Sequence, residues 1–280
     1  MKIKFYGTSA GGGIPEIFCY CRVCEYARQH GGKDIRTRSQ AVIDDCLGVE
    51  YPVDTFAHTA YRGLDMRKVR NILITHAHHD HFLTADILSR PQGIDRVNFY
   101  VPEASGRALK ASIEKQEEAY RNGTRKKTCD FSVSVHDLKH YQTYDIIGYQ
   151  VTPLRAHHQD ALDSSLYIIR KDDKCILWGF DTGRFYEDVL EYIKASGVRF
   201  DFVVLDCTLK ENEQITELHM DLTWCREMAD KLTEMGAVDE RTRIMVSHIG
   251  HLVEKTHEEL CEAAARYGME VAYDGLEIEI

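Results

Sequence analysis

The chain has 280 residues, 44% of them hydrophobic and 29% charged, and its formal net charge is −10. This composition is typical of a soluble globular protein and excludes a disordered chain, a collagen-like fibre and a small disulfide-rich protein. No apolar stretch approaches the roughly 20 residues of a membrane span, and the acidic charge repels nucleic-acid backbones, so we expect a cytoplasmic protein with neither a membrane nor a nucleic acid as partner.

The first half of the chain is predicted to start with strands and to continue with helices between further strands. Residues 3–7 alternate in polarity and then break at the glycines of 11–13, as a strand followed by a tight loop does. Apolar runs and helix-forming stretches predict further strands at 41–44, 69–75 and 97–102, and helices at 82–90 and 103–122.

The second half repeats this order. Strands are expected at 131–136, 149–154, 165–170, 175–180, 202–206, 243–247 and 271–280, and helices at 185–196, 221–235 and 256–267. Strands that come first in each half, with helices interleaved later, predict an α/β protein with two sheets face to face and helices outside, a four-layer αββα sandwich. A doubly wound parallel sheet is the alternative, which the lack of a Gly-x-Gly-x-x-Gly motif disfavours. No linker is evident, so residues 1–280 are predicted to form one domain.

A cluster of histidines follows the predicted strand at 69–75. The segment 75–81 reads THAHHDH, in a chain with 14 histidines. Imidazole and carboxylate are ligands that zinc, iron and manganese accept, and a tight turn can direct residues i and i+2 to one ion and residues i+4 and i+5 to a second. A solvated polar loop is the other interpretation. The metal interpretation is favoured because four potential ligands follow a buried strand: His76, His78, Asp80 and His81, with His79 pointing away.

The pattern His-x-His-x-Asp-His after a hydrophobic strand resembles the signature of the metallo-β-lactamase superfamily. The resemblance implies the αββα sandwich independently, with His76 and His78 on one metal ion and Asp80 and His81 on the other. It also implies three later ligands, each after a predicted strand: His158, Asp181 and His248. Asp181 would bridge the two ions. The adjacent His157 is the alternative to His158, and a turn aspartate and a strand-end histidine without metal are the alternatives for the other two.

A second candidate site lies near the N-terminus, where the chain reads Cys19-x-Cys21-x-x-Cys24. Three thiols within six residues suit a tetrahedral zinc ion, although unligated loop cysteines are the simpler alternative. The motif resembles one branch of the superfamily, the cyclic-phosphate phosphodiesterases of the carbon–phosphorus lyase pathway. The pyrroloquinoline-quinone biosynthesis B proteins open in a similar way. The resemblance implies that His251, three residues after His248, completes a structural zinc site.

The resemblance implies a dinuclear zinc or manganese hydrolase that acts on a small anionic phosphodiester, including a cyclic one. A hydroxide that bridges the two ions would attack phosphorus, with Asp80 in the catalytic centre. His219 is the candidate general acid, because it precedes a predicted helix where this branch has a histidine that is not a ligand. A helix-start histidine without function is the equal alternative.

Other assignments stay open at this point. Asp54 is a candidate for the buried aspartate that orients the histidine turn, and Asp206 and Asp274 are candidates to support the metal ligands. An RNA-processing endonuclease of the ribonuclease Z type, a non-catalytic carrier like the quinone-pathway protein, and thioester or lactone hydrolysis are the alternative functions. Metal identity is open between zinc and manganese, and a homodimer is one possible assembly.

Overall fold

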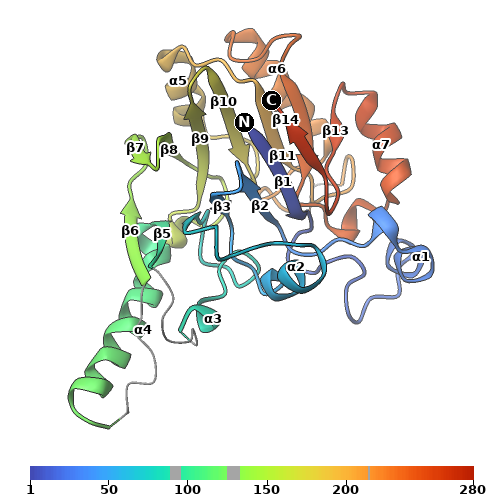
Figure 1. The fold of residues 1–280 in the computed structure, drawn as a ribbon. Coiled ribbons are helices and arrows are strands. Elements are labelled where there is room, and N and C mark those ends of the chain that lie inside the picture. Colours follow the sequence, from blue (N-terminus) through green and yellow to red (C-terminus); the bar gives the residue numbers. More distant parts are fainter. Residues whose placement is uncertain (89–95, 125–132, 214) are drawn as a thin grey trace.

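Two seven-stranded sheets form the centre of the part that the computed structural model describes, which is residues 1–88, 96–124, 133–213 and 215–280 (Figure 1). In spatial order the first sheet contains β14 (Glu277–Glu279), β1 (Lys2–Gly7), β2 (Gln40–Ile43), β3 (Leu47–Val49), β4 (Asn71–Leu73), β5 (Val97–Pro102) and β6 (Val133–Leu138). The second contains β13 (Glu270–Val271), β12 (Arg243–Ser247), β11 (Phe202–Asp206), β10 (Lys174–Gly179), β9 (Ser165–Lys171), β8 (Tyr149–Arg155) and β7 (Tyr144–Ile146).

The helices lie on the outer faces of the two sheets. They are α1 (Arg22–His30), α2 (Thr55–Tyr61), α3 (Thr84–Leu88), α4 (Glu103–Arg121), α5 (Glu187–Ser196), α6 (Leu222–Glu234) and α7 (His257–Ala265). Apolar side chains of α1, α5, α6 and α7 pack in one cluster with the second sheet, and those of α3 and α4 in another with the first sheet. Figure 1 shows α4 projecting from the body of the molecule. The predicted four-layer αββα sandwich is confirmed.

A third apolar cluster fills the space between the sheets. Phe5 of β1 stacks on Trp178 of β10 with ring centroids 5.7 Å apart, and both side chains are fully buried. Tyr149 and Tyr167 belong to the same cluster. Strands that are buried on both faces read as continuous apolar runs, which is why 175–180 and 202–206 could be recognised from the sequence. This double burial fixes the strand ends, and with them the loops that follow.

The predicted last strand, 271–280, is wrong. The segment forms two short strands in different sheets: β13 pairs with β12, and β14 pairs with β1. Between them the chain turns at Tyr273–Leu276, where the Leu276 N–H donates to the Tyr273 carbonyl and Gly275 has φ of +95°. Glycine populates positive φ without a steric penalty, so Asp274-Gly275 was the turn signal inside the apolar run.

Several short elements were not predicted: α1, α2, β3 and β7. Two predicted elements extend outside the described residues, the helix at 82–90 beyond residue 88 and the strand at 131–136 before residue 133. Within the described parts of the chain, every helix is too short or too polar to cross a membrane.

Candidate metal centre

The seven predicted ligands lie in loops that follow strands of both sheets. The turn 75–81 comes after β4, whereas His158, Asp181 and His248 come after β8, β10 and β12. The strands β8, β10 and β12 run in the same direction. Both β8 and β10 are antiparallel to β9, which lies between them. In addition, β10 is parallel to β11, and β11 is parallel to β12. Their carboxyl ends therefore meet at one edge of the second sheet, beside the turn after β4.

The first group of side chains is His76, His78, His158 and Asp181, whose ligand atoms all lie within 4.8 Å of one another. Nε2 of His76 is 2.7 Å from Nδ1 of His78, and Nε2 of His158 is 3.2 Å from the same atom. His157 lies outside this group and packs its ring against Tyr186, with centroids 4.5 Å apart. The geometry thus places His158, and not His157, at the centre.

The second group is Asp80, His81, His248 and Asp181, again within 4.8 Å. Nε2 of His81 is 3.3 Å from Oδ2 of Asp80 and 3.3 Å from Nε2 of His248. Asp181 belongs to both groups, because its Oδ2 lies 3.1 Å from Nε2 of His76 and 3.1 Å from Nε2 of His81. His79 points away, with 80% of its side chain exposed.

These donors fit a pair of divalent cations. Burial, together with the nearby His81, lowers the pKa of His76 to about 3, so this imidazole is neutral and has a lone pair to offer. Burial opposes ionisation of Asp181, yet the surrounding histidines His248 and His76 hold its pKa well below the ordinary value. Among the described residues, the buried Oδ1 of Asp181 has no hydrogen-bond partner. A buried, ionised carboxylate with an unsatisfied oxygen, surrounded by imidazole nitrogens, is the donor set that such cations use.

A buried glutamate that the sequence analysis missed supports the histidine turn. Oε1 of Glu50 accepts a hydrogen bond from Thr75 Oγ1 at 2.6 Å and lies 3.3 Å from Nδ1 of His81. The prediction that Asp54 orients this turn is wrong, because Asp54 accepts the Arg38 backbone N–H and pairs with the Arg38 guanidinium at 3.2 Å. Glu50 directly follows β3, whereas Asp54 lies at the start of α2. The sequence signal for Glu50 is its position directly after the apolar run of β3, in the segment LGVE at 47–50.

Asp206 lies behind the last histidine, but Asp274 does not. Oδ2 of Asp206 is 3.0 Å from Nδ1 of His248, and its Oδ1 accepts the backbone N–H groups of Thr208 and Met220. Burial disfavours the charged form, yet His219 and His248 lower the pKa of Asp206.

The prediction that Asp274 supports the His248 turn is wrong. Asp274 accepts hydrogen bonds from Thr8 and Thr37 and pairs with Arg62 at 3.1 Å. Asp274 lies in the turn between β13 and β14. Its contacts hold this turn against the residues that follow β1 and do not reach the metal ligands.

His219 lies in the loop before α6 and faces the two groups. Its Nδ1 is 3.0 Å from Oδ2 of Asp206, and its ring stacks on His248 with centroids 5.7 Å apart. Burial alone would lower its pKa, but the carboxylates of Asp206 and Asp181 raise the pKa to about 9. Among the described residues, its Nε2 has no hydrogen-bond partner.

A cavity of about 430 Å³ opens onto both groups. Its wall includes Asp80, Asp181 and His219, and also the glycine loop 11–13. The loop approaches so closely that a Cβ on Gly11 would lie 3.0 Å from Oδ2 of Asp80. The cavity gives a small molecule access to the ligand cluster from solvent.

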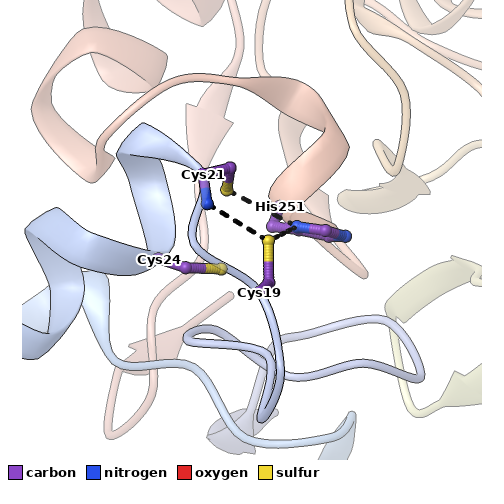
Figure 2. Close-up of side chains that lie close together, drawn as sticks. All are labelled: Cys19, Cys21, Cys24 and His251. Carbon is purple, nitrogen blue, oxygen red and sulfur yellow. Dashed lines mark hydrogen bonds between the residues drawn. The ribbon is translucent and has the colours of Figure 1, made fainter.

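The cysteine motif forms a separate cluster (Figure 2). The Sγ atoms of Cys19 and Cys21 lie 3.2 and 3.6 Å from Nδ1 of His251, and the ligand atoms of these residues and Cys24 are within 4.8 Å of one another. Burial raises the pKa of the Cys21 thiol, but hydrogen bonds from the Cys24 backbone and from His251 outweigh burial and lower it to about 7. Three thiols and one imidazole around one point fit a tetrahedral zinc ion.

Comparisons with known proteins agree with this fold. A family model described as the beta-lactamase superfamily domain matches residues 42–271. The chain is also 33% identical over 85 residues to an octanoyltransferase of Porphyromonas gingivalis, but it spans only 16% of the length of that relative.

Solved structures resemble the chain over its whole length. A new diphosphatase from the PhnP family has a TM-score of 0.73 at 23% identity, covering 100% of this chain and 98% of the other. Zn²⁺-bound PqqB from Methylobacterium extorquens has a TM-score of 0.63 at 17% sequence identity, and the match covers 100% of both chains. The short form of human tRNase Z has a TM-score of 0.63 at 16% sequence identity, and the match covers 100% of this chain and 99% of the other. At these identities the likeness shows the fold, and the family match over most of the chain shows that this protein belongs to the metallo-β-lactamase superfamily of hydrolases.

Proposed function

We propose that this protein is a single-domain, dinuclear metal-dependent hydrolase that acts on a small phosphodiester, linear or cyclic. The observation that carries the proposal is the pair of ligand groups that share Asp181 at the wall of an open cavity. One zinc or manganese ion would be held by His76, His78 and His158. The other would be held by Asp80, His81 and His248, and Asp181 would contact both ions. A bound pair of cations supplies a hydroxide nucleophile near neutral pH and neutralises charge on the phosphoryl oxygens.

The chain's own residues orient the reaction. Glu50 and Asp206 lie behind His81 and His248 and fix the orientation of these imidazole rings. His219 would protonate the leaving oxygen through Nε2, because its Nδ1 faces the Asp206 carboxylate and the residue lines the cavity. The carboxylate stabilises the protonated ring, as a general acid needs.

Charge supports a small substrate over RNA. The net charge is −10, and the described residues that line the cavity include no lysine or arginine. An RNA grip requires several cationic contacts to the backbone, so the ribonuclease Z alternative finds no support at this surface. The likeness to a PhnP-family diphosphatase, with the cysteine motif, favours phosphorus as the reacting centre.

A turnover screen tests the proposal. Protein loaded with zinc or manganese should hydrolyse bis(p-nitrophenyl) phosphate and a linear or cyclic alkyl phosphodiester, and the metal-stripped protein should not. Lactone and thioester substrates in the same screen serve as alternatives. Turnover of these substrates without any phosphodiester hydrolysis would overturn the proposal, and so would a fully metallated protein that hydrolyses nothing.

We propose further that Cys19, Cys21, Cys24 and His251 hold a structural zinc ion. Cys21→Ser should lower the zinc content by about one ion and lower the melting temperature, while the two catalytic ions stay bound, because ligand loss removes binding energy that stabilises the fold. Cys46→Ser is the control, since Cys46 lies in the β2–β3 turn, has its Sγ 3.6 Å from the Tyr149 hydroxyl and does not belong to the cluster. Lost activity at unchanged stability and zinc content would indicate a catalytic or redox role instead.

A substitution of Glu50 tests whether this carboxylate holds His81 in position for the second metal ion. Glu50→Gln removes the charge facing His81 but keeps an oxygen that can accept from Thr75, so the fold should persist. The affinity for the second catalytic ion should fall roughly 10- to 100-fold, as for other residues that orient a metal ligand. Titration of metal into stripped protein measures this loss. Glu277→Gln, which changes a surface pair with Lys2, should leave the affinity unchanged.

A further inference from the structure

One wall of the cavity carries a carboxylate that the reaction proposed above does not use. Glu16, in the loop between β1 and α1, lines the cavity together with Gly12 and His251. Its side chain is 42% exposed, so a molecule in the cavity can reach it. Glu16 belongs to neither catalytic ligand group.

One side-chain contact and two backbone contacts hold Glu16 beside the cysteine cluster. Its Oε2 lies 3.0 Å from Nε2 of His251, the nitrogen that faces away from the cysteines. Its backbone N–H donates to Cys24 Sγ at 3.3 Å, and its carbonyl accepts from Arg28 at 2.6 Å. If His251 binds zinc through Nδ1, its Nε2 would carry the proton and donate a hydrogen bond to Glu16.

The glycine loop holds the Glu16 carboxylate close to the catalytic ligands. A Cβ on Gly12 would lie 3.3 Å from Cδ of Glu16, and a Cβ on Gly11 would lie 3.0 Å from Oδ2 of Asp80. Consecutive glycines therefore pack against the two carboxylates. A substrate whose phosphate lies beside Asp80 would place its non-reacting arm near Glu16.

In the described lining of the cavity, Glu16 contacts the His251 imidazole, and no permanently cationic side chain neutralises its charge. The described lining residues include no lysine or arginine. Arg38 lies behind the glycine loop, where it donates to the Gly11 carbonyl and pairs with Asp54 at 3.2 Å. Asp80 and Asp181 face the proposed cations, and three thiolates with a neutral imidazole would leave the zinc cluster with an excess negative charge. This side of the cavity is thus anionic.

We propose that Glu16 is a specificity-determining residue. It favours phosphodiesters whose non-reacting arm carries an ammonium or hydroxyl group, and it disfavours arms with a second anionic group. A donor on the arm can hydrogen-bond to the carboxylate, whereas a second anion meets a like charge that is not neutralised. The proposal rests on the proposed function, because the catalytic ions must hold the reacting phosphate for the arm to reach Glu16.

Three small monophosphates with arms of similar size test the proposal by calorimetric binding to the metal-loaded protein. They are 2-aminoethyl phosphate, propyl phosphate and phosphoglycolate, with cationic, neutral and anionic arms. The wild-type protein should bind them in this order of decreasing affinity, each step being roughly fivefold, the upper range for an exposed charge pair. In Glu16→Gln the affinities for the cationic and anionic arms should converge on the value for propyl phosphate.

The control is Glu240→Gln, which makes the same change of charge at an exposed residue before β12. It should leave the wild-type order intact. Equal wild-type affinities, no binding of any of the three, or an order that survives Glu16→Gln would each overturn the proposal. A graded order without hydrolysis of any phosphodiester in the turnover screen would overturn the proposed function alone. Phosphodiester hydrolysis with equal affinities would overturn the role of Glu16 alone.

Discussion

Replacing Asp181 by alanine should abolish dinuclear metal binding and slow hydrolysis of bis(p-nitrophenyl) phosphate by roughly 10³-fold or more, because several kcal/mol of charge stabilisation depend on the ions. The reason is geometric. One oxygen of Asp181 lies 3.1 Å from both His76 and His81, so this carboxylate is the shared member of both ligand groups. Elemental analysis of the purified variant, together with initial rates, measures the two losses.

The matched control is Asp230→Asn, which removes one negative charge from an exposed pair with Arg226 on α6. It should keep full metal content and activity. Circular dichroism should show that Asp181→Ala keeps its fold, since Asp181 lies at the end of a strand and its buried charge contributes no apolar packing. A folded variant that retains two ions, or one that loses both ions but keeps its activity, would contradict the proposed centre.

The sandwich could be predicted because its strands are buried on both faces. The apolar runs at 175–180 and 202–206 lie almost unchanged in β10 and β11, and the histidine turn follows β4 as the sequence indicated. Short elements gave no comparable signal: β3 and β7 have three residues each, too few to show a period. The single strand predicted at 271–280 is wrong because the apolar residues of this run belong to two strands in different sheets, which one turn connects.

The residues behind the metal ligands could be predicted only in part. Asp206 ends an apolar strand next to the predicted cluster, and it lies behind His248. Glu50 has the same position after β3, but β3 is too short to be predicted from the sequence, and Asp54 was therefore the candidate acid. Which acid meets which histidine depends on how the two sheets are aligned, and that alignment is a tertiary property. The choice between the adjacent His157 and His158 also required the structure, because one residue reverses the direction of a side chain.

His219 provides the second test with a large expected effect. His219→Ala should slow hydrolysis of an alkyl phosphodiester by roughly 10²- to 10⁴-fold, the usual contribution of a general acid. It should slow bis(p-nitrophenyl) phosphate much less, because a nitrophenolate departs without a proton. The comparison of the two substrates isolates proton donation, and metal content should stay at the wild-type level. His157→Ala is the matched control, since this neighbouring histidine packs on Tyr186.

The other outcomes of the His219 experiment separate the remaining roles. Equal slowing of both substrates would show that His219 binds substrate and does not donate a proton. Loss of a metal ion would make His219 a ligand, which is geometrically conceivable because its ring nitrogen lies within 4.8 Å of ligand atoms from Asp181, Asp206 and His248. That result would displace His158 or His248 from the proposed ligand sets. The 3.0 Å contact between Nδ1 of His219 and Asp206 leaves Nε2 as the nitrogen that would donate a proton or bind a metal, and the metal content of His219→Ala distinguishes these two roles.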